Sequence, residues 1–554
     1  MGKLVPKFFT ILKSYTRQQF IKDITAGIIV AIIALPLSIA LALASGVSPE
    51  QGLYTAIAAG FVISFLGGSL VQIAGPTAAF ATIVAGIVAR NGMSGLIIAT
   101  IMAGIILIVM GLLRLGSLIK FIPYTITTGF TAGIALTIVV GQLKDFFGLT
   151  IVTEEPLIET TEKLSAVVKN FSTINMQAVI VGVVCLAVLI IFPMLPGVLK
   201  KIPGSLAAVV VGIIMVKGFH MNVNTIGDLY EISSSLPSIQ LPGISLSTIG
   251  ALLPDAFTIA ILAAIESLLS CVVADSMVND RHNSNMELVA QGAGNIASAL
   301  FGGIPATGAI ARTAANVKNG GRTPVSGMIH SVTLLLILVL LMPYAALIPM
   351  PAIAAILFIV AYNMCEWRKF VYLVRTSPKS DIIVLVVTFI LTVLFDLVVA
   401  IEFGMLLAVV LFMKRMSEET EVSGWKYVDD ADHDPDSITL RTVPKGVLVY
   451  EISGPLFFGV TDKIMDITLR MHDKCLVLRM RSVNSIDATA IHALEELYKE
   501  CKQKKIHMVL SHVNEQPMKS MEKAGFVDSL GAENFQPHID EALKRAEELV
   551  SKRA

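Results

Sequence analysis

The chain has 554 residues, of which 55% are hydrophobic and only 15% are charged, and its formal net charge at pH 7 is zero. A soluble protein of this length carries far more charge, so the composition excludes that class. The apolar residues form blocks of roughly 20 between short polar loops, the length that crosses a bilayer as a helix. The sequence therefore predicts a polytopic membrane protein.

The N-terminal residues 1–22 are polar and basic, and the apolar block that starts near Ile24 has no small-residue cleavage motif after it. We therefore expect no cleavable signal peptide. The five cysteines are scattered, without the paired spacing of a disulfide framework or a metal site. We interpret them as reduced packing residues, and we expect no metal and no cofactor.

Hydropathy predicts about fourteen apolar segments before Met413. The predicted spans are 24–44, 52–67, 70–89, 95–113, 123–142, 177–195, 205–217, 253–274, 289–302, 306–317, 324–342, 348–362, 382–396 and 398–413. With the N-terminus inside, most lysines and arginines fall in loops on the cytoplasmic side, and few fall opposite. The positive-inside rule then predicts that both termini are cytoplasmic. We expect a multi-pass transport domain over 23–415 in the plasma (inner) membrane.

Residues 439–554 have the character of a soluble domain. Strand patterns such as "CLVLRMRSV" alternate with amphipathic helix patterns such as "DATAIHALEELYKECKQKK", which is typical of an α/β domain. Residues 416–438 are assigned to a linker. Its acidic stretch "DDADHDPDS" (429–437) lacks the glycine and the twelfth-position glutamate of a calcium loop, so we interpret it as solvated chain.

Two apolar segments are broken by proline and glycine. The first is "VQIAGPTAAFATIVAG" (71–86) and the second is "GGIPATGAIARTAANV" (302–317). Each pattern predicts a short extended piece, then a proline at the start of a half-helix. A helix broken at membrane depth usually lines a cavity, and the spare N–H groups of a helix start favour an anion. Two such starts facing each other would bind an anion.

An internal repeat pairs the two breaks. "DITAGIIVAIIALPLSIALA" from Asp23 aligns with "DAFTIAILAAIESLLSCVVA" from Asp255, and Ser38 aligns with Ser270. The same offset places Thr77 against Ala309, within a few residues of the second break. With seven crossings in each half, the second half must be inverted, and paired broken helices in inverted halves indicate the midplane site of a secondary transporter.

Two ionisable residues lie deep in the apolar region, where a charge is costly unless it is paired or hydrated. Arg312 lies within the second half-helix, and it either attracts the anion or forms a structural pair with Glu266 or a carbonyl group. Glu266 lies mid-segment, and it is either a coupling site for a proton or cation or a member of a structural ion pair. The hydroxyls of Thr77, Ser38 and Thr307 either donate to the anion or bond to their own backbone.

The sequence resembles the SulP (sulfate permease, solute carrier family 26) anion transporters over essentially its whole length. The resemblance rests on "LPLSIALALASGVSPEQGLYTAIAAG", "QIAGPTAAF", "AIESLLSCVVADSM", the stretch from Asn285 to Ser331, and a C-terminal region similar to a STAS domain. It implies a helical protein with a seven-plus-seven inverted repeat, core and gate subdomains, an elevator-like movement and a homodimer. It implies no enzymatic activity.

By that resemblance the anion lies between the two half-helix starts, with the first segment contributing around Leu35 to Ser38. The implied binding residues are Pro36, Ser38, Thr77, Ala78, Gly308, Ala309, Ile310 and Arg312, with Glu266 as the coupling residue. Sodium-coupled bicarbonate members of the family have aspartate in place of Glu266 and threonine in place of Ile310. The glutamate is similar to bacterial C4-dicarboxylate members, thought to be proton-coupled. We therefore expect proton-linked uptake of a dicarboxylate such as fumarate or succinate, with sulfate or bicarbonate as the alternative, by symport or exchange.

Thr489 lies where proteins related to the STAS domain carry a phosphorylatable hydroxyl, although a threonine after Asp487 at a helix start needs no regulatory explanation. The expected partners are a small anion, a proton rather than sodium, membrane lipid, a second copy, and a cytosolic protein for the STAS region, but no nucleic acid. Two rival functions stay open: an anion channel on the same scaffold, and a membrane-anchored signalling protein.

Overall fold

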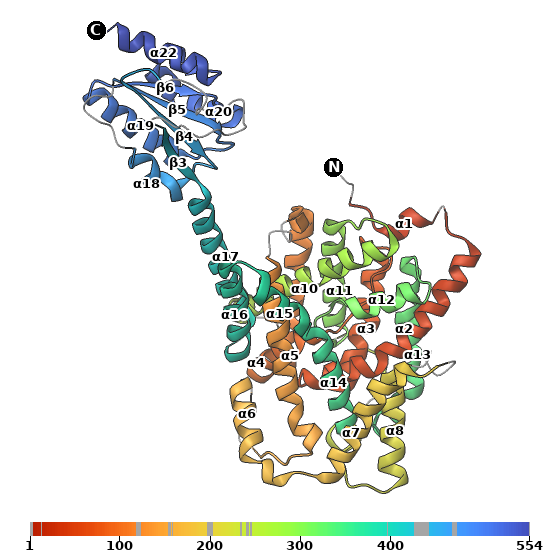
Figure 1. Cartoon of the computed structure of the whole chain (residues 1–554). Helices are drawn as coiled ribbons and strands as arrows, with labels where there is room; N and C mark the ends of the chain where they lie inside the picture. Colours follow the sequence, from red (N-terminus) through yellow and green to blue (C-terminus); the bar gives the residue numbers. More distant parts are fainter. Residues whose placement is uncertain are drawn as a thin grey trace. The chain divides into compact units, whose positions relative to one another are not determined.

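A computed structural model describes residues 4–12, 14–117, 123–152, 157, 159–196, 203–232, 235–239, 243, 246–395, 397–425, 443–467 and 474–552. The chain divides into two compact units, Met1–Leu406 and Leu407–Ala554, with the boundary inside one long helix. The first unit is almost entirely helical, whereas the second contains a sheet (Figure 1).

Most helices of the first unit lie in predicted apolar segments, although several short ones do not. The helices are α1 (Lys7–Ile11), α2 (Arg17–Ala44), α3 (Pro49–Leu66), α4 (Ala78–Leu112), α5 (Tyr124–Phe147), α6 (Thr160–Lys169), α7 (Met176–Ile191), α8 (Gly204–Gly218), α9 (Ile226–Leu229), α10 (Leu246–Val278), α11 (Ser284–Leu300), α12 (Ile310–Lys318), α13 (Pro324–Ala345), α14 (Met350–Cys365), α15 (Trp367–Thr376), α16 (Lys379–Leu394) and α17 (Leu397–Glu419), with 3-10 turns Phe171–Thr173 and Phe192–Met194.

Seven helices in the described part of the chain are long and apolar enough to cross a membrane unaided. The other predicted segments correspond to further helices such as α3 and α17, or to the two parts of α4, where Gly92 interrupts the helix with φ 66°. Glycine accepts this left-handed conformation at little cost, so it separates the segments predicted at 70–89 and 95–113. The helical polytopic fold predicted from the sequence is confirmed.

The two broken segments meet in the middle of the first unit. Strand β1 (Ala74–Gly75) pairs antiparallel with β2 (Thr307–Gly308), and each strand leads into a half-helix. Thr77 is the N-cap of α4 and Ala309 the N-cap of α12, so the two caps are separated by the same number of residues as Asp23 and Asp255. This equality supports the predicted repeat.

The prediction that a proline starts the second half-helix was wrong for Pro305. Pro76 directly precedes the N-cap of α4, but Pro305 precedes β2 and does not start α12. The Asn295 side chain accepts from the Ala306 N–H at 2.8 Å and donates to the Ala306 carbonyl at 2.8 Å. These bonds keep the chain extended after the proline, so the helix begins only at Ile310.

The second unit is an α/β domain with a sheet of order β3-β4-β5-β6-β7. Strand β3 pairs antiparallel with β4, and the other pairs are parallel. The strands are β3 (Glu421–Trp425), β4 (Val447–Ser453), β5 (Cys475–Ser482), β6 (His507–Ser511) and β7 (Phe535–Gln536), and the helices are α18 (Thr461–Met465), α19 (Ala488–Gln503), α20 (Glu515–Lys523), α21 (Phe526–Leu530) and α22 (Ile539–Ser551), with 3-10 turns Phe458–Val460 and Ala532–Asn534.

Helices cover both faces of this sheet, as a parallel sheet requires. Helix α22 packs on one face through Ile539, Ala542 and Ala546, while α18 to α21 pack on the other. Strand β3 lies within 416–438, the segment assigned to a linker, and the acidic stretch 429–437 lies outside the described residues. The buried thiols belong to this core, and burial raises the pKa of Cys475 and of Cys501 to about 12.

The start of α19 gives a test of this unit. Asp487 Oδ1 accepts from the Ala490 N–H at 2.8 Å, and Oδ2 accepts from the Phe458 N–H at 3.0 Å. We expect Asp487→Ala to cost about 1 kcal/mol of local stability, because both N–H groups lose a charged acceptor. Hydrogen–deuterium exchange of α19 peptides in the full-length protein measures this. Asp487→Asn, which still caps, is expected to lose less, and equal losses would contradict the capping role.

Candidate anion site at the paired half-helix starts

The extended segments at the two breaks are held by side-chain hydrogen bonds. The Ile73 N–H donates to Thr313 Oγ1 at 3.0 Å, and the Ala309 N–H donates to the Ile73 carbonyl at 2.8 Å. The Thr307 hydroxyl donates to the Ala263 carbonyl of α10 at 3.1 Å. Backbone polar groups away from water need partners, so these side chains make the non-helical backbone tolerable at this depth.

A buried carboxylate anchors the chain that leads into β1. Glu287 of α11 is fully buried and accepts from the N–H groups of Gly68 and Ser69 at 2.9 and 3.2 Å. It also accepts from the side-chain amides of Gln72 and Gln291 at 3.1 and 2.8 Å. One charged group therefore satisfies four donors, and this fixes the approach to the first half-helix.

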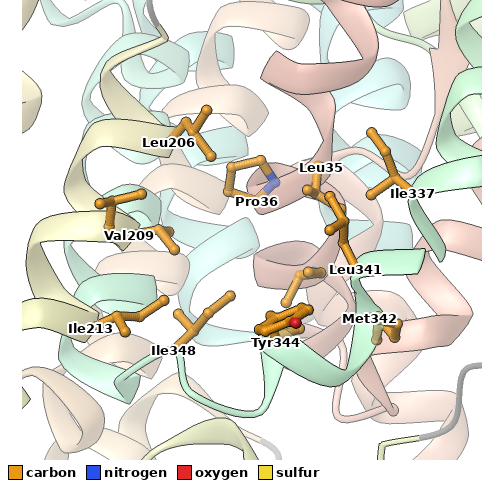
Figure 2. Close-up of a pocket in the computed structure, with 13 residues that line it drawn as sticks. Leu35, Pro36, Leu206, Val209, Ile213, Ile337, Leu341, Met342, Tyr344 and Ile348 are labelled. Carbon is orange, nitrogen blue, oxygen red and sulfur yellow. The ribbon is translucent and has the colours of Figure 1, made fainter. Parts of the chain in front are cut away.

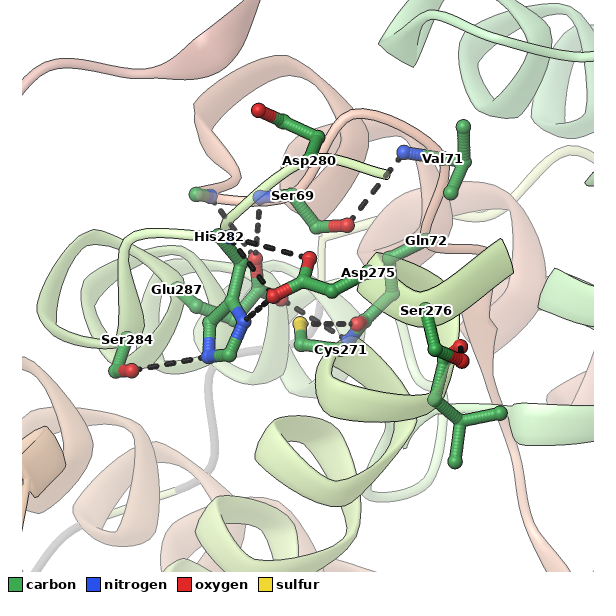
Figure 3. Close-up of polar contacts among 12 residues, drawn as sticks. Ser69, Val71, Gln72, Cys271, Asp275, Ser276, Asp280, His282, Ser284 and Glu287 are labelled. Atoms are coloured by element: carbon green, nitrogen blue, oxygen red, sulfur yellow. Dashed lines mark hydrogen bonds and ion pairs between the residues drawn. The ribbon is translucent and has the colours of Figure 1, made fainter. Parts of the chain in front are cut away.

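The turn before α11 is tied down next to this carboxylate (Figure 3). The His282 N–H donates to both carboxylate oxygens of Asp275 at 3.1 Å, and its ring Nδ1 lies 2.7 Å from Asp275 Oδ2. Ser284 Oγ lies 2.9 Å from the other ring nitrogen. The cluster thus joins the end of α10 to the start of α11, and it holds Glu287 in place.

Arg312 is the largest fully buried side chain of the described residues, with 1% of its surface exposed. Its Nη2 donates to the Pro76 carbonyl at 3.2 Å, while Nε and Nη1 have no hydrogen-bond partner. No ion pair joins it to Glu266 in the part of the chain that the structure describes. The carbonyl alternative is therefore observed, and two nitrogens of the guanidinium are left without a hydrogen-bond partner.

Glu266 lies on α10, opposite the start of α4. Its Oε2 accepts from the Thr77 hydroxyl at 2.9 Å. Neither N-cap, Thr77 or Ala309, makes a side-chain capping bond. The positive ends of two half-helices, a carboxylate and a buried guanidinium are thus gathered around one short antiparallel pair.

Some of the other predicted binding residues lie at the two breaks, and the rest lie on α2. Ala78 and Gly308 are buried at the breaks, and Ile310 is 43% exposed at the first turn of α12. On α2, which packs against α12, Ser38 is fully buried and its hydroxyl has no partner. Pro36 lines an apolar cavity of about 180 Å³ between α2, α8 and α13, together with Leu35, Val209 and Leu341 (Figure 2).

Comparison with known proteins identifies the family. The sequence model of the sulfate permease family matches residues 20–388, and that of the STAS domain matches residues 440–542. The chain belongs to the sulfate permease family. It is therefore a multi-pass secondary anion transporter and not an enzyme.

Relatives match this chain over nearly its whole length. It is 39% identical over 97% of its length, and 99% of the relative's, to YvdB of Bacillus subtilis, which is provisionally named a sulfate transporter. It is 33% identical to the bicarbonate transporter BicA of Picosynechococcus sp., over 95% and 94% of the two chains. These names favour the alternative substrates, sulfate or bicarbonate, over the expected C4-dicarboxylates.

Solved structures agree on the fold. The murine Slc26a9 anion transporter in its inward-facing state superimposes with a TM-score of 0.88 at 20% identity, over 98% of this chain and 94% of that one. The transmembrane domain of a cyanobacterial BicA gives 0.62 at 28% identity, over 74% and 100%. The architecture of this permease is thus that of the SLC26 anion transporters.

The sequence did not single out Glu287, Asn295 or the buried His330. Asn295 and His330 are polar residues inside predicted apolar segments, which is the signal that could have found them, whereas Glu287 lies just before one. In the second unit Thr489 is exposed in the first turn of α19, where Asp487 is the N-cap. That position fits an ordinary helix start.

Gly75 offers a test of the Arg312 position. A Cβ at this residue would collide with Arg312 Nη1, so Gly75→Ala is expected to displace the guanidinium. We expect anion uptake to fall about tenfold to hundredfold, the value of a hydrogen bond to a charged group. Uptake into proteoliposomes measures this. Gly141→Ala, where a Cβ meets nothing within 4 Å, is the matched control, and equal uptake by both variants would contradict the assignment.

Proposed function

We propose that the protein is a secondary active transporter that takes up sulfate together with protons. The observation that carries this proposal is the buried guanidinium of Arg312, which has two unbonded nitrogens beside two half-helix starts. A dianion gains more than a monoanion from such a positive field. Bicarbonate is the second candidate, since BicA is named a bicarbonate transporter.

The bond between Thr77 and Glu266 supports a route for proton coupling. While Glu266 is ionised, its negative charge repels the anion and its oxygen holds the Thr77 hydroxyl. Protonation removes that charge and frees the hydroxyl to donate to the anion. Proton and anion therefore favour each other's binding, and the coupling is reciprocal.

The proposal includes the arrangement expected of the family. Both termini are cytoplasmic, two copies form a homodimer, and a core containing the half-helices moves against a gate in an elevator-like manner. The STAS domain is then exposed to cytosolic protein partners. Ile310 stands where sodium-coupled bicarbonate members have threonine, which supports protons over sodium as the coupling ion.

Uptake into proteoliposomes tests the substrate and the coupling ion. Labelled sulfate, bicarbonate and fumarate are each supplied with an inward proton gradient, an inward sodium gradient, or neither. We expect sulfate to accumulate with the proton gradient alone. Accumulation of fumarate instead would restore the dicarboxylate interpretation, sodium-driven bicarbonate uptake would overturn the coupling model, and flux that never exceeds equilibrium would indicate a channel.

Glu266→Gln tests the role of the carboxylate. The amide cannot exchange a proton, so we expect proton-driven accumulation to fall about tenfold or more while downhill sulfate flux persists. Glu231→Gln, at an exposed residue of the same unit, is the control and keeps accumulation. A Glu266→Gln protein that concentrates sulfate as well as the wild type would exclude Glu266 as a coupling group.

Thr77 is tested by a pair of variants. Thr77→Val removes the hydroxyl that bonds Glu266, and we expect it to weaken proton-driven uptake about tenfold. Thr77→Ser keeps the hydroxyl and is expected to restore uptake. If serine is no better than valine, the hydroxyl is not the coupling link.

A further inference from the structure

His330 is a buried titratable residue that the proposed function does not use. It lies on α13 with none of its surface exposed, and neither ring nitrogen has a hydrogen-bond partner. Buried polar groups are nearly always bonded, and an unbonded one is costly. An imidazole kept in this state indicates a partner that is bound for only part of the transport cycle.

The structure places His330 beside the candidate anion site. The neighbouring Ser331 hydroxyl donates to the Ala56 carbonyl of α3 at 3.1 Å. Ala56 in turn lies against Gly75, whose other neighbour is Arg312 Nη1. Both His330 and Arg312 are fully buried, with 0% and 1% of their surfaces exposed. The unbonded imidazole and the unbonded side of the guanidinium therefore share one buried region.

Other charged groups on the elements around α13 are engaged elsewhere or lie toward helix ends. Asp23 of α2 accepts from Tyr15, Gln19 and Thr323. Lys7 of α1 pairs with Asp280 at 2.7 Å. Arg17 and Lys22 of α2 lie at its exposed first turns, Glu50 lies in the first turn of α3, and Lys318 ends α12. Glu266 on α10 is bonded to Thr77. Arg312 is thus the buried charge in this group that no ion pair of the described residues neutralises.

We propose that His330 is a proton-binding residue of the anion site, which takes up a proton when a dianion binds at Arg312. Without an anion, a second positive charge beside a buried guanidinium is unfavourable. A bound dianion reverses the sign of the local field, so the imidazolium form then becomes favourable. This inference rests on the proposed function and deepens it, because it adds a second proton carrier to Glu266.

The two carriers act from different elements and in different ways. Protonation of Glu266 on α10 removes a negative charge, whereas protonation of His330 on α13 adds a positive charge. Both changes favour the anion. One proton on each residue would balance the two charges of sulfate, so the loaded site would carry no more charge than the empty one.

Calorimetry of sulfate binding counts the protons. Sulfate is titrated into the full-length protein in detergent, in buffers that differ in ionisation enthalpy. Sulfate keeps its charge across neutral pH, so any proton taken up belongs to the protein. We expect His330→Gln to take up about one proton fewer per sulfate than the wild type, as reciprocal linkage requires. His220→Asn, in an exposed loop at a positive φ that asparagine accepts, is the matched control and keeps the wild-type count.

An equal proton count in His330→Gln and the wild type would overturn the proposal, even with normal accumulation of sulfate. A lower count in His330→Gln without gradient-driven accumulation by the wild type would support it and overturn the proposed uptake alone. Absence of sulfate binding by the wild type would overturn both.

A second measurement does not depend on how the variant folds. Infrared difference spectra of the wild-type protein with ring-labelled histidine, recorded with and without sulfate, report imidazole protonation directly. An imidazolium band that appears with sulfate supports the proposal, and its absence overturns it. The more compact variant His330→Asn then assigns the band, which is expected to be lost.

Discussion

The first unit depends on how two stretches of non-helical backbone are satisfied inside an apolar protein. A helix bonds its own backbone, but the segments around β1 and β2 cannot, and each unsatisfied group would cost several kcal/mol in hydrocarbon. Polar side chains in and next to the apolar segments supply the hydrogen-bond partners that this backbone lacks. The Glu287 carboxylate accepts from the backbone N–H groups of Gly68 and Ser69. The Asn295 side chain bonds both the N–H and the carbonyl of Ala306, and Thr313 Oγ1 accepts from the Ile73 N–H.

The same constraint produces the candidate anion site. Because β1 comes from the first half of the repeat and β2 from the second, their pairing fixes the two half-helix starts relative to each other. Each start offers N–H groups that nothing in its own helix can accept. Arg312 reaches across the pair to the Pro76 carbonyl, so the cation that favours an anion also links the second half-helix to the first.

The sequence predicted the elements and the breaks because these depend on local signals. The length of the apolar blocks predicted the helices, and proline and glycine predicted the interruptions. Arg312 and Glu266 were singled out because they are charged residues deep in apolar segments. The structure supplied what depends on tertiary partners. The residues next to Glu266 do not predict its bond to Thr77, which lies on another helix. Nor do the residues next to Pro305 predict a strand there, because the bonds that keep this chain extended come from Asn295 of α11. Strand β3 was not predicted either, because it is defined by its pairing with β4 and not by a pattern in its own residues.

The charges at the half-helix starts explain why protons and a dianion belong together. While the carboxyl of Glu266 is ionised, its charge is opposite to that of Arg312, so the two groups together carry no net charge. Protonation of Glu266 leaves the positive charge of Arg312 unbalanced. When a dianion binds, the two negative charges exceed that one positive charge, and the site carries a net negative charge. Within a low-dielectric core such an excess is costly, and we propose that the buried imidazole of His330 cancels it by taking a proton.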